Sequence, residues 1–167
     1  LVNFERLRMQ KKYENSYPYY ISAVYFLDKR YDDVLNYAVP KLKTTHQQHE
    51  TEMLRIVDAS YFAKANYDKA AEYYARFEDQ DQGKTQNTQD SYQMGYAYYK
   101  VGNFAKAATE LEKLQQTNDV FSQNGNYTLG NVFLKMNNKQ SARNAFFAAS
   151  KLDFDKQLQE DALYEYA

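Results

Sequence analysis

The chain has 167 residues, a formal net charge of -1 and 26% charged residues, so charge alone excludes a nucleic-acid binder that depends on net positive charge. Leucine, isoleucine, valine and phenylalanine together make up about one fifth of the sequence, which is a small supply for an ordinary core. The 18 tyrosines, and the equally numerous alanines, are therefore expected to fill the interior, because aromatic rings bury large areas and alanine lets helices approach closely.

Cysteine is absent, which excludes disulfides, thiolate metal ligands and a cysteine nucleophile but leaves the compartment open. The longest wholly apolar run is Ala23–Leu27, far shorter than the roughly 20 residues of a membrane-spanning helix. Because the chain begins at Leu1 and stops at Ala167 inside a helical pattern, we expect it to be a piece of a longer protein, from which no signal peptide can be read.

Helix is the favoured secondary structure, because the chain has only two prolines and five glycines and is rich in good helix formers. One predicted helix has apolar or core positions spaced i, i+3, i+4 and i+7 at Leu54, Val57, Asp58 and Tyr61. After a break at Ala65-Asn66, the same spacing recurs at Tyr67, Ala70, Ala71 and Tyr74. The two stretches predict a pair of amphipathic helices.

The helix pair recurs along the chain. Tyr31 precedes Tyr67 by 36 residues, and Tyr67 precedes Phe104 by 37, which indicates an internal repeat whose unit is a helical hairpin. The expected units are four repeats at 15–50, 51–87, 88–122 and 123–159, preceded by a second-helix remnant at 1–14 and followed by a first-helix remnant at 160–167. Polar connections are expected between units, at Thr44–Glu50, Phe77–Thr88 and Gln115–Gln123. The stretch Glu78–Asp90 lacks apolar periodicity and is expected to be a surface linker.

Two copies carry the clearest pattern. The first contains Met94-Gly95, Tyr98, Gly102-Asn103-Phe104, Ala107 and Leu111, and the second contains Leu129-Gly130, Phe133, Asn137-Asn138, Ala142 and Phe146. These residues resemble the tetratricopeptide repeat, a 34-residue helix-turn-helix unit with Leu-Gly, Tyr, Ala, Phe and Pro landmarks. The resemblance covers nearly the whole chain and implies an all-α fold, a right-handed α-solenoid of tetratricopeptide repeats.

Such a chain would be a fragment of a longer tetratricopeptide protein, which the composition indicates to be bacterial. Its richness in tyrosine, glutamine and asparagine resembles repeat proteins of bacterial cell envelopes. Localisation therefore stays open between the cytoplasm and a bacterial cell envelope or periplasm. Self-association through the truncated ends is a further expectation, because repeat units bury their apolar faces against neighbours.

Small residues are expected where neighbouring helices approach closely, at Gly95, Gly130, Ser22 and Ala167. Asp58 occupies the same position, where a carboxylate needs a partner, and a tyrosine hydroxyl is the expected one.

The turns use Ala65-Asn66, Gly102-Asn103 and Asn137-Asn138, and glycine and asparagine tolerate positive φ. Two positions depart from this pattern. Lys29-Arg30 lacks both residue types. Lys139 replaces an aromatic residue, which predicts a more open or solvated last turn.

No arrangement of residues predicts catalysis. His46 and His49, followed by Glu50 and Glu52, offer a weak metal-site pattern, but two histidines in a glutamine-rich connection are more often solvated polar residues. The sequence has no glycine-rich phosphate loop, no Gly-x-Ser-x-Gly and no His-Glu-x-x-His string. We therefore predict a protein that is not an enzyme, without catalytic residues, metal or cofactor.

Each predicted first helix carries a second stripe spaced i, i+4 and i+7, which places its members on one face. The stripes are Tyr19, Ala23 and Phe26; Arg55, Ala59 and Phe62; Tyr92, Tyr96 and Tyr99; and Tyr127, Asn131 and Leu134, with Tyr164 and Glu165 continuing them. The resemblance implies that first helices line a concave surface. The expected partner-binding groove therefore contains Tyr19, Phe26, Arg55, Phe62, Tyr92, Tyr96, Tyr99, Tyr127, Asn131 and Tyr164.

Two interpretations of the stripes stay open, packing between repeats and docking of a peptide on tyrosine rings. Some tetratricopeptide proteins grip a chaperone's C-terminal carboxylate with a Lys, Asn and Arg clamp. Here Tyr19, Ala23, Ile56 and mainly Arg55 stand on that face, so the clamp is not reproduced, and a partner of apolar or mixed character is expected. Lys100 and Lys135 would give the far end a mildly positive rim.

The sequence thus predicts a non-enzymatic scaffold that binds a protein or peptide through a tyrosine-rich groove, with no nucleic-acid partner and no membrane span. A sensor module that binds a small molecule or glycan and signals to another domain is the alternative. A purely structural spacer is a third hypothesis.

Overall fold

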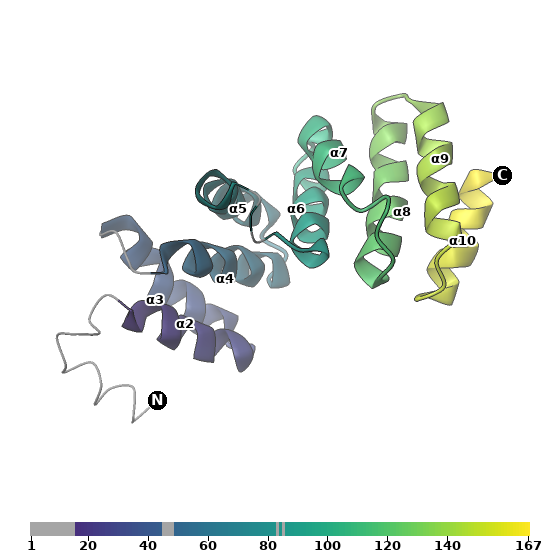
Figure 1. Cartoon of the computed structure of the whole chain (residues 1–167). Coiled ribbons are helices and arrows are strands. Elements are labelled where there is room, and N and C mark those ends of the chain that lie inside the picture. Colours follow the sequence, from purple (N-terminus) through teal and green to yellow (C-terminus); the bar gives the residue numbers. More distant parts are fainter. Residues whose placement is uncertain (1–15, 45–48, 83, 85) are drawn as a thin grey trace. The chain divides into compact units, whose positions relative to one another are not determined.

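The computed structural model describes residues 16–44, 49–82, 84 and 86–167, and the expected second-helix remnant at 1–14 and His46 lie outside them (Figure 1). The described residues form a succession of α-helices without strands. The helices are α2 (Tyr17–Leu27), α3 (Tyr31–Thr44), α4 (Glu50–Ala63), α5 (Tyr67–Asp81), α6 (Thr88–Lys100), α7 (Phe104–Glu112), α8 (Val120–Lys135), α9 (Lys139–Ser150) and α10 (Lys156–Tyr166). The prediction of an all-α fold is confirmed.

The chain divides into two compact units, Leu1–Lys84 and Thr85–Ala167. In the first unit α2 packs against α3 and α4 against α5, while α4 also contacts α2 and α3. In the second unit α6 packs against α7 and α8 against α9, α7 contacts α8, α9 contacts α10, and α8 contacts both α6 and α10. Within each unit, hairpins of consecutive helices therefore stack in chain order, which is a helical-repeat arrangement.

All four hairpins turn in the same way. The residue after each first helix's cap has positive φ, at Lys29, Ala65, Gly102 and Asn137. The next residue, Arg30, Asn66, Asn103 or Asn138, donates its backbone N–H to the carbonyl five residues earlier at 2.8–2.9 Å. This is the Schellman arrangement, which satisfies the carbonyls left over at a helix end. The last hairpin shares this arrangement, so backbone hydrogen bonds close its turn as they close the others. Lys139 is nevertheless exposed, whereas Tyr31, Tyr67 and Phe104 at the equivalent position are partly buried, so the expected solvation of this turn is confirmed.

Asparagine then begins three of the second helices. The side chains of Asn66, Asn103 and Asn138 accept hydrogen bonds from backbone N–H groups three residues later at 3.3, 3.3 and 3.1 Å, which is the N-cap interaction. The first hairpin has Arg30 at this place, and its guanidinium Nε donates to the Asp33 carboxylate at 2.7 Å instead.

Close helix packing occurs where small residues were expected. A β-carbon at Gly95 would overlap the side chain of Leu111, and one at Gly130 would overlap the ring of Phe146. Ser22 is fully buried and donates its hydroxyl to the Pro18 carbonyl at 2.6 Å. Asp58 is buried as well, and its tyrosine hydroxyl partner stays a prediction.

Tyrosine and alanine do fill much of the interior. The buried tyrosines are Tyr17, Tyr73, Tyr74 and Tyr98, and the buried alanines include Ala70, Ala97, Ala107, Ala145 and Ala149. The compositional prediction is therefore confirmed: large rings and small methyl groups replace part of the usual leucine core.

Two expected connections are shorter than predicted. Helix α5 continues to Asp81, so 78–81 is helical rather than part of a loop, and α8 already begins at Val120. The last turn of α5 is supported from α4, because Gln80 accepts from the Thr51 hydroxyl at 3.0 Å and donates to Glu50 at 3.2 Å. Among the helices described, none combines the length and apolarity that crossing a membrane requires.

Candidate functional site

An exposed aromatic surface lies on the second unit, where α6 and α8 pack side by side. We call it the tyrosine surface. It consists of Tyr92, Tyr96 and Tyr99 of α6 and Phe121, Tyr127 and Asn131 of α8, each of which is partly exposed. Five of its six members were predicted as groove residues, and Phe121 is the addition.

Four rings of the tyrosine surface, those of Tyr92, Tyr96, Tyr99 and Phe121, form a continuous series. The ring centroids of Tyr92 and Tyr96 are 5.8 Å apart, and those of Tyr96 and Tyr99 are 6.4 Å apart. Tyr92 also contacts Phe121 across the two helices at 6.1 Å. Spacing of i, i+4 and i+7 places the α6 rings on one face, as the sequence predicted, and the contact between helices extends that face to α8.

Tyr127 lies on α8, which contacts both α9 and α10. Its ring packs edge-on against buried Phe146 at 5.4 Å, and the Asn131 side chain donates to its backbone carbonyl at 3.2 Å. Burial raises the pKa of the Tyr127 hydroxyl, and the negative charges of Glu165 and Asp161 raise the pKa further.

Tyr164 stands apart from the other predicted groove residues. It lies on α10 and is 83% exposed, the most exposed of the large apolar and aromatic side chains described. Leu134 of α8, also on a predicted stripe, is exposed too. Tyr164 shares its helix with Asp161 and Glu165, so α10 offers an exposed ring beside two carboxylates.

The remaining predicted groove residues belong to the first unit. The ring of Tyr19 lies 4.9 Å from His49, and the guanidinium of Arg55 lies 5.7 Å from the centroid of Phe77. Phe26 and Phe62 pack edge-on against Tyr31 and Tyr67 at 5.8 and 5.6 Å. These four residues are partly exposed, and each contacts its own unit.

The third position of the stripe has a packing role. Phe26, Phe62 and Tyr99 each contact the ring that begins the following helix, the last of these pairs being Tyr99 and Phe104 at 6.2 Å. These contacts close the hairpins, so they explain much of the aromatic character at that position. Tyr92 and Tyr96 instead contact rings on the first helices α6 and α8.

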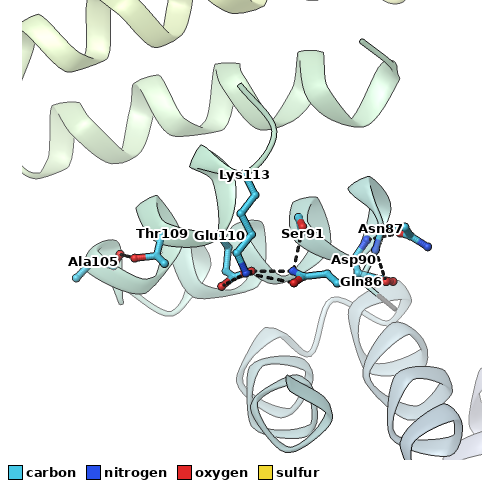
Figure 2. Close-up of polar contacts among 8 residues, drawn as sticks. All are labelled: Gln86, Asn87, Asp90, Ser91, Ala105, Thr109, Glu110 and Lys113. Atoms are coloured by element: carbon cyan, nitrogen blue, oxygen red, sulfur yellow. Dashed lines mark hydrogen bonds and ion pairs between the residues drawn. The ribbon is translucent and has the colours of Figure 1, made fainter. Parts of the chain in front are cut away.

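Polar contacts fix where α6 begins (Figure 2). Glu110 of α7 is buried, and its carboxylate accepts hydrogen bonds from Lys113 Nζ at 2.7 and 2.9 Å and from Gln86 Nε2 at 2.9 Å. Gln86 Nε2 also donates to the Ser91 hydroxyl at 2.9 Å. Asn87 and Asp90 form a capping box at the first turn of α6. Together these contacts tie the connection before α6 to α7.

Asp119, the N-cap of α8, connects the starts of two first helices. It accepts hydrogen bonds from the Thr88 hydroxyl of α6 at 2.6 Å and from the Ser122 backbone N–H and hydroxyl at 2.7 Å. Burial opposes ionisation of the carboxyl group, but these hydrogen bonds outweigh it and lower the pKa of Asp119. Asp119 thus links the first turns of the two helices that carry the tyrosine surface.

Gln123 holds the connection between α9 and α10. Its amide is fully buried, donates to the carbonyls of Leu152 and Asp155 at 2.8 and 2.9 Å, and accepts from the Asp155 backbone N–H at 2.8 Å. These hydrogen bonds satisfy backbone groups of an irregular segment. They place α10, with its carboxylates, beside α8.

The sequence pattern missed Phe121 and the Glu110 network. Phe121 was missed because its position had been assigned to the polar connection Gln115–Gln123. Glu110 looks like an ordinary surface charge in the sequence, and its burial depends on the helices that pack around it. In the described part of the chain, no group of three or more His, Cys, Asp or Glu side chains is placed to hold a metal ion.

The sequence matches no protein-family model and no curated protein. The geometry of the tyrosine surface is therefore the basis for a functional conclusion.

Proposed function

We propose that this chain is a non-enzymatic interaction scaffold of tetratricopeptide type, a right-handed α-solenoid whose first helices receive a partner peptide or protein segment. The stacked hairpins with recurring Schellman turns support this assignment. The binding site is the tyrosine surface of the second unit.

One observation carries the proposal: the rings of Tyr92, Tyr96 and Tyr99 are partly exposed in a continuous series, although Tyr98 beside them is buried. Tyrosine presents a large, rigid contact area and a polar tip at low cost in conformational entropy. A series of such rings on one helix face suits the side chains of an extended or helical peptide.

The experiment is selection of random peptides displayed on phage against the full chain, followed by affinity measurements with synthetic copies of the selected sequences. The test variant replaces Tyr92 and Tyr96 by alanine. The matched control replaces Phe147 and Tyr166, another contacting aromatic pair of this unit at 4.9 Å, by alanine. Circular dichroism and thermal unfolding establish that both variants are folded.

We expect affinity to fall on the order of 10-fold or more in the Tyr92→Ala, Tyr96→Ala variant and to change little in the control, because buried aromatic anchors dominate interface energies. Selected peptides that bind the folded tyrosine variant as tightly as the original chain would refute the site. A thermal-shift panel of glycans and small metabolites addresses the sensor alternative, in which a ligand raises the unfolding midpoint.

A further inference from the structure

The two helices that carry the tyrosine surface are almost free of charge. Helix α8 has no charged residue before its last one, Lys135, and α6 has none between Asp90 and its last residue, Lys100. Asp90 is buried in the capping box. In a chain with 26% charged residues, the middle of this surface therefore offers a partner rings, hydroxyls and amides instead of ion pairs.

The rings of this surface are inclined to one another. The interplanar angle is 44° between Tyr92 and Tyr96, 60° between Tyr96 and Tyr99, and 37° between Tyr92 and Phe121. Because none of these pairs is stacked in parallel, the rings do not cover one another's faces, and each ring is partly exposed. Such faces provide contact area for a compact apolar group, such as the pyrrolidine ring of proline.

Hydrogen bonding narrows the conformation of a segment that binds on these rings. Tyrosine hydroxyls both donate and accept hydrogen bonds, so they suit a ligand whose backbone carbonyls are available. An α-helical ligand uses its carbonyls internally. An extended strand gains affinity by pairing with a sheet edge, and the described part of the chain contains no strand. A polyproline II segment has no internal hydrogen bonds, so its carbonyls stay available.

The ring series on α6 is about as long as one turn of polyproline II. Tyr92 and Tyr99 are seven residues apart, which is a rise of about 10.5 Å along an α-helix. Three residues of polyproline II rise about 9.3 Å. Prolines at positions i and i+3 of a bound segment can therefore contact the two ends of the series, with Tyr96 between them.

We propose that the tyrosine surface binds a proline-rich segment in the polyproline II conformation, with proline at every third residue along the rings of Tyr92, Tyr96 and Tyr99. The inference rests on the proposed function and names the partner of the same site. Proline fixes φ near the polyproline II value before binding, which reduces the conformational entropy lost in the complex. Aromatic surfaces recognise proline-rich segments through this advantage.

The test measures the binding of three fluorescently labelled peptides to the full chain by fluorescence anisotropy. The first is a proline-only peptide of about ten residues, or roughly three turns of polyproline II. The second has proline at every third position, with alanine and glutamine between. The third contains the residues of the second, reordered so that no two prolines lie three positions apart. The folded Tyr92→Ala, Tyr96→Ala variant and the Phe147→Ala, Tyr166→Ala control serve as before.

We expect the first two peptides to bind and the reordered peptide to bind about 5-fold more weakly or worse, because its prolines do not follow one edge of the polyproline II helix. Affinity for the first two should fall on the order of 10-fold in the tyrosine variant and change little in the control. It should change less than about 2-fold between about 0.05 and 0.5 M salt, because no ion pair contributes.

The failures of the two proposals are distinguishable. If peptides from the phage selection depend on Tyr92 and Tyr96 while the proline peptides do not bind, the partner class is overturned and the tyrosine surface remains the binding site. Equal binding of the second and third peptides, a strong salt dependence, or undiminished binding to the tyrosine variant would each overturn the polyproline II inference. Failure of selected and proline peptides alike would overturn both proposals.

Discussion

The backbone of Gly130 in α8 lies directly against the ring of Phe146 in α9: a β-carbon at residue 130 would be 2.5–2.6 Å from three ring atoms. The ring is buried, with 1% of its surface exposed, and is too rigid to bend away. Packing of the α8–α9 hairpin therefore depends on the absence of a side chain at residue 130.

Gly130→Ala should destabilise the protein. Alanine improves helix propensity by about 1 kcal/mol, but overpacking a buried contact costs about 1–3 kcal/mol, and the displaced group here is a whole aromatic ring. We expect a net loss of about 1–2 kcal/mol in the free energy of unfolding, measured by urea denaturation. Gly102→Asn is the matched control, because residue 102 has open space around it and Asn137 adopts the equivalent positive φ. Its free energy of unfolding should differ from that of the original chain by less than about 1 kcal/mol. Equal stability of Gly130→Ala and the original chain would disprove the close contact.

Ala65→Gly should stabilise the second hairpin. Ala65 has φ of 56°, a left-handed conformation that costs a residue with a β-carbon about 1 kcal/mol and that glycine adopts freely. We expect the free energy of unfolding to rise by about 0.5–1 kcal/mol, which raises the midpoint temperature of thermal unfolding. Ala75→Gly, in the middle of α5, should instead lose about 0.5–1 kcal/mol. A loss at both positions would contradict the turn geometry.

Glu110→Ala should lower the free energy of unfolding by about 1–3 kcal/mol. It removes a buried acceptor and leaves Gln86 Nε2 and Lys113 Nζ without the carboxylate that they share, although Lys113 is partly exposed and can regain water. Hydrogen exchange at the first turn of α6 should accelerate, because Gln86 no longer ties the preceding connection to α7. Glu112→Ala, on the exposed side of the same helix, should stay within about 0.5 kcal/mol.

Asp119→Asn should produce a pH-dependent loss of stability. The pKa of Asp119 is lowered in the folded state, so its ionised form stabilises the protein above the ordinary aspartate pKa. That contribution disappears as the pH falls through the folded-state pKa. At neutral pH we expect Asp119→Asn to cost about 1 kcal/mol, because Thr88 and Ser122 lose a charged acceptor. The difference from the original chain should shrink in acid. Asp153→Asn, at an exposed surface pair with Lys156, should give no comparable trend, and a pH-independent Asp119→Asn effect would contradict the prediction.

Much of the local structure was readable from the sequence. The i, i+3, i+4 spacing placed Leu54 and Val57 in the core, the Gly-Asn and Asn-Asn pairs located the turns, and Gly95 and Gly130 marked close contacts. These features depend on backbone conformation and side-chain size within one hairpin, so a short stretch of sequence contains the physical cause. The turn at Lys29-Arg30 was harder to predict, because lysine and arginine do not favour positive φ. Lys29 nevertheless adopts a positive φ, and the Schellman hydrogen bonds form there as in the other turns.

The rest required partners far apart in the sequence. Residues 78–81 looked like a loop because they lack apolar periodicity, yet Gln80 meets Thr51 and Glu50 of α4, and those contacts extend the helix. Likewise, the stripe on α6 predicted a face for Tyr92 and Tyr96 but could not tell that Phe121 would join it.

The repeating helical hairpins, their turns and the residues that share a helix face were predictable from the sequence, because these features follow from propensity, periodicity and capping within a few turns of helix. Other features depended on tertiary packing: Phe121 of α8 contacts Tyr92 of α6, and Glu110 of α7 is buried where it accepts a hydrogen bond from Gln86. Periodicity gives each side chain a direction around its own helix. The environment it meets there depends on which neighbouring helix packs against that face, and that is settled by long-range packing.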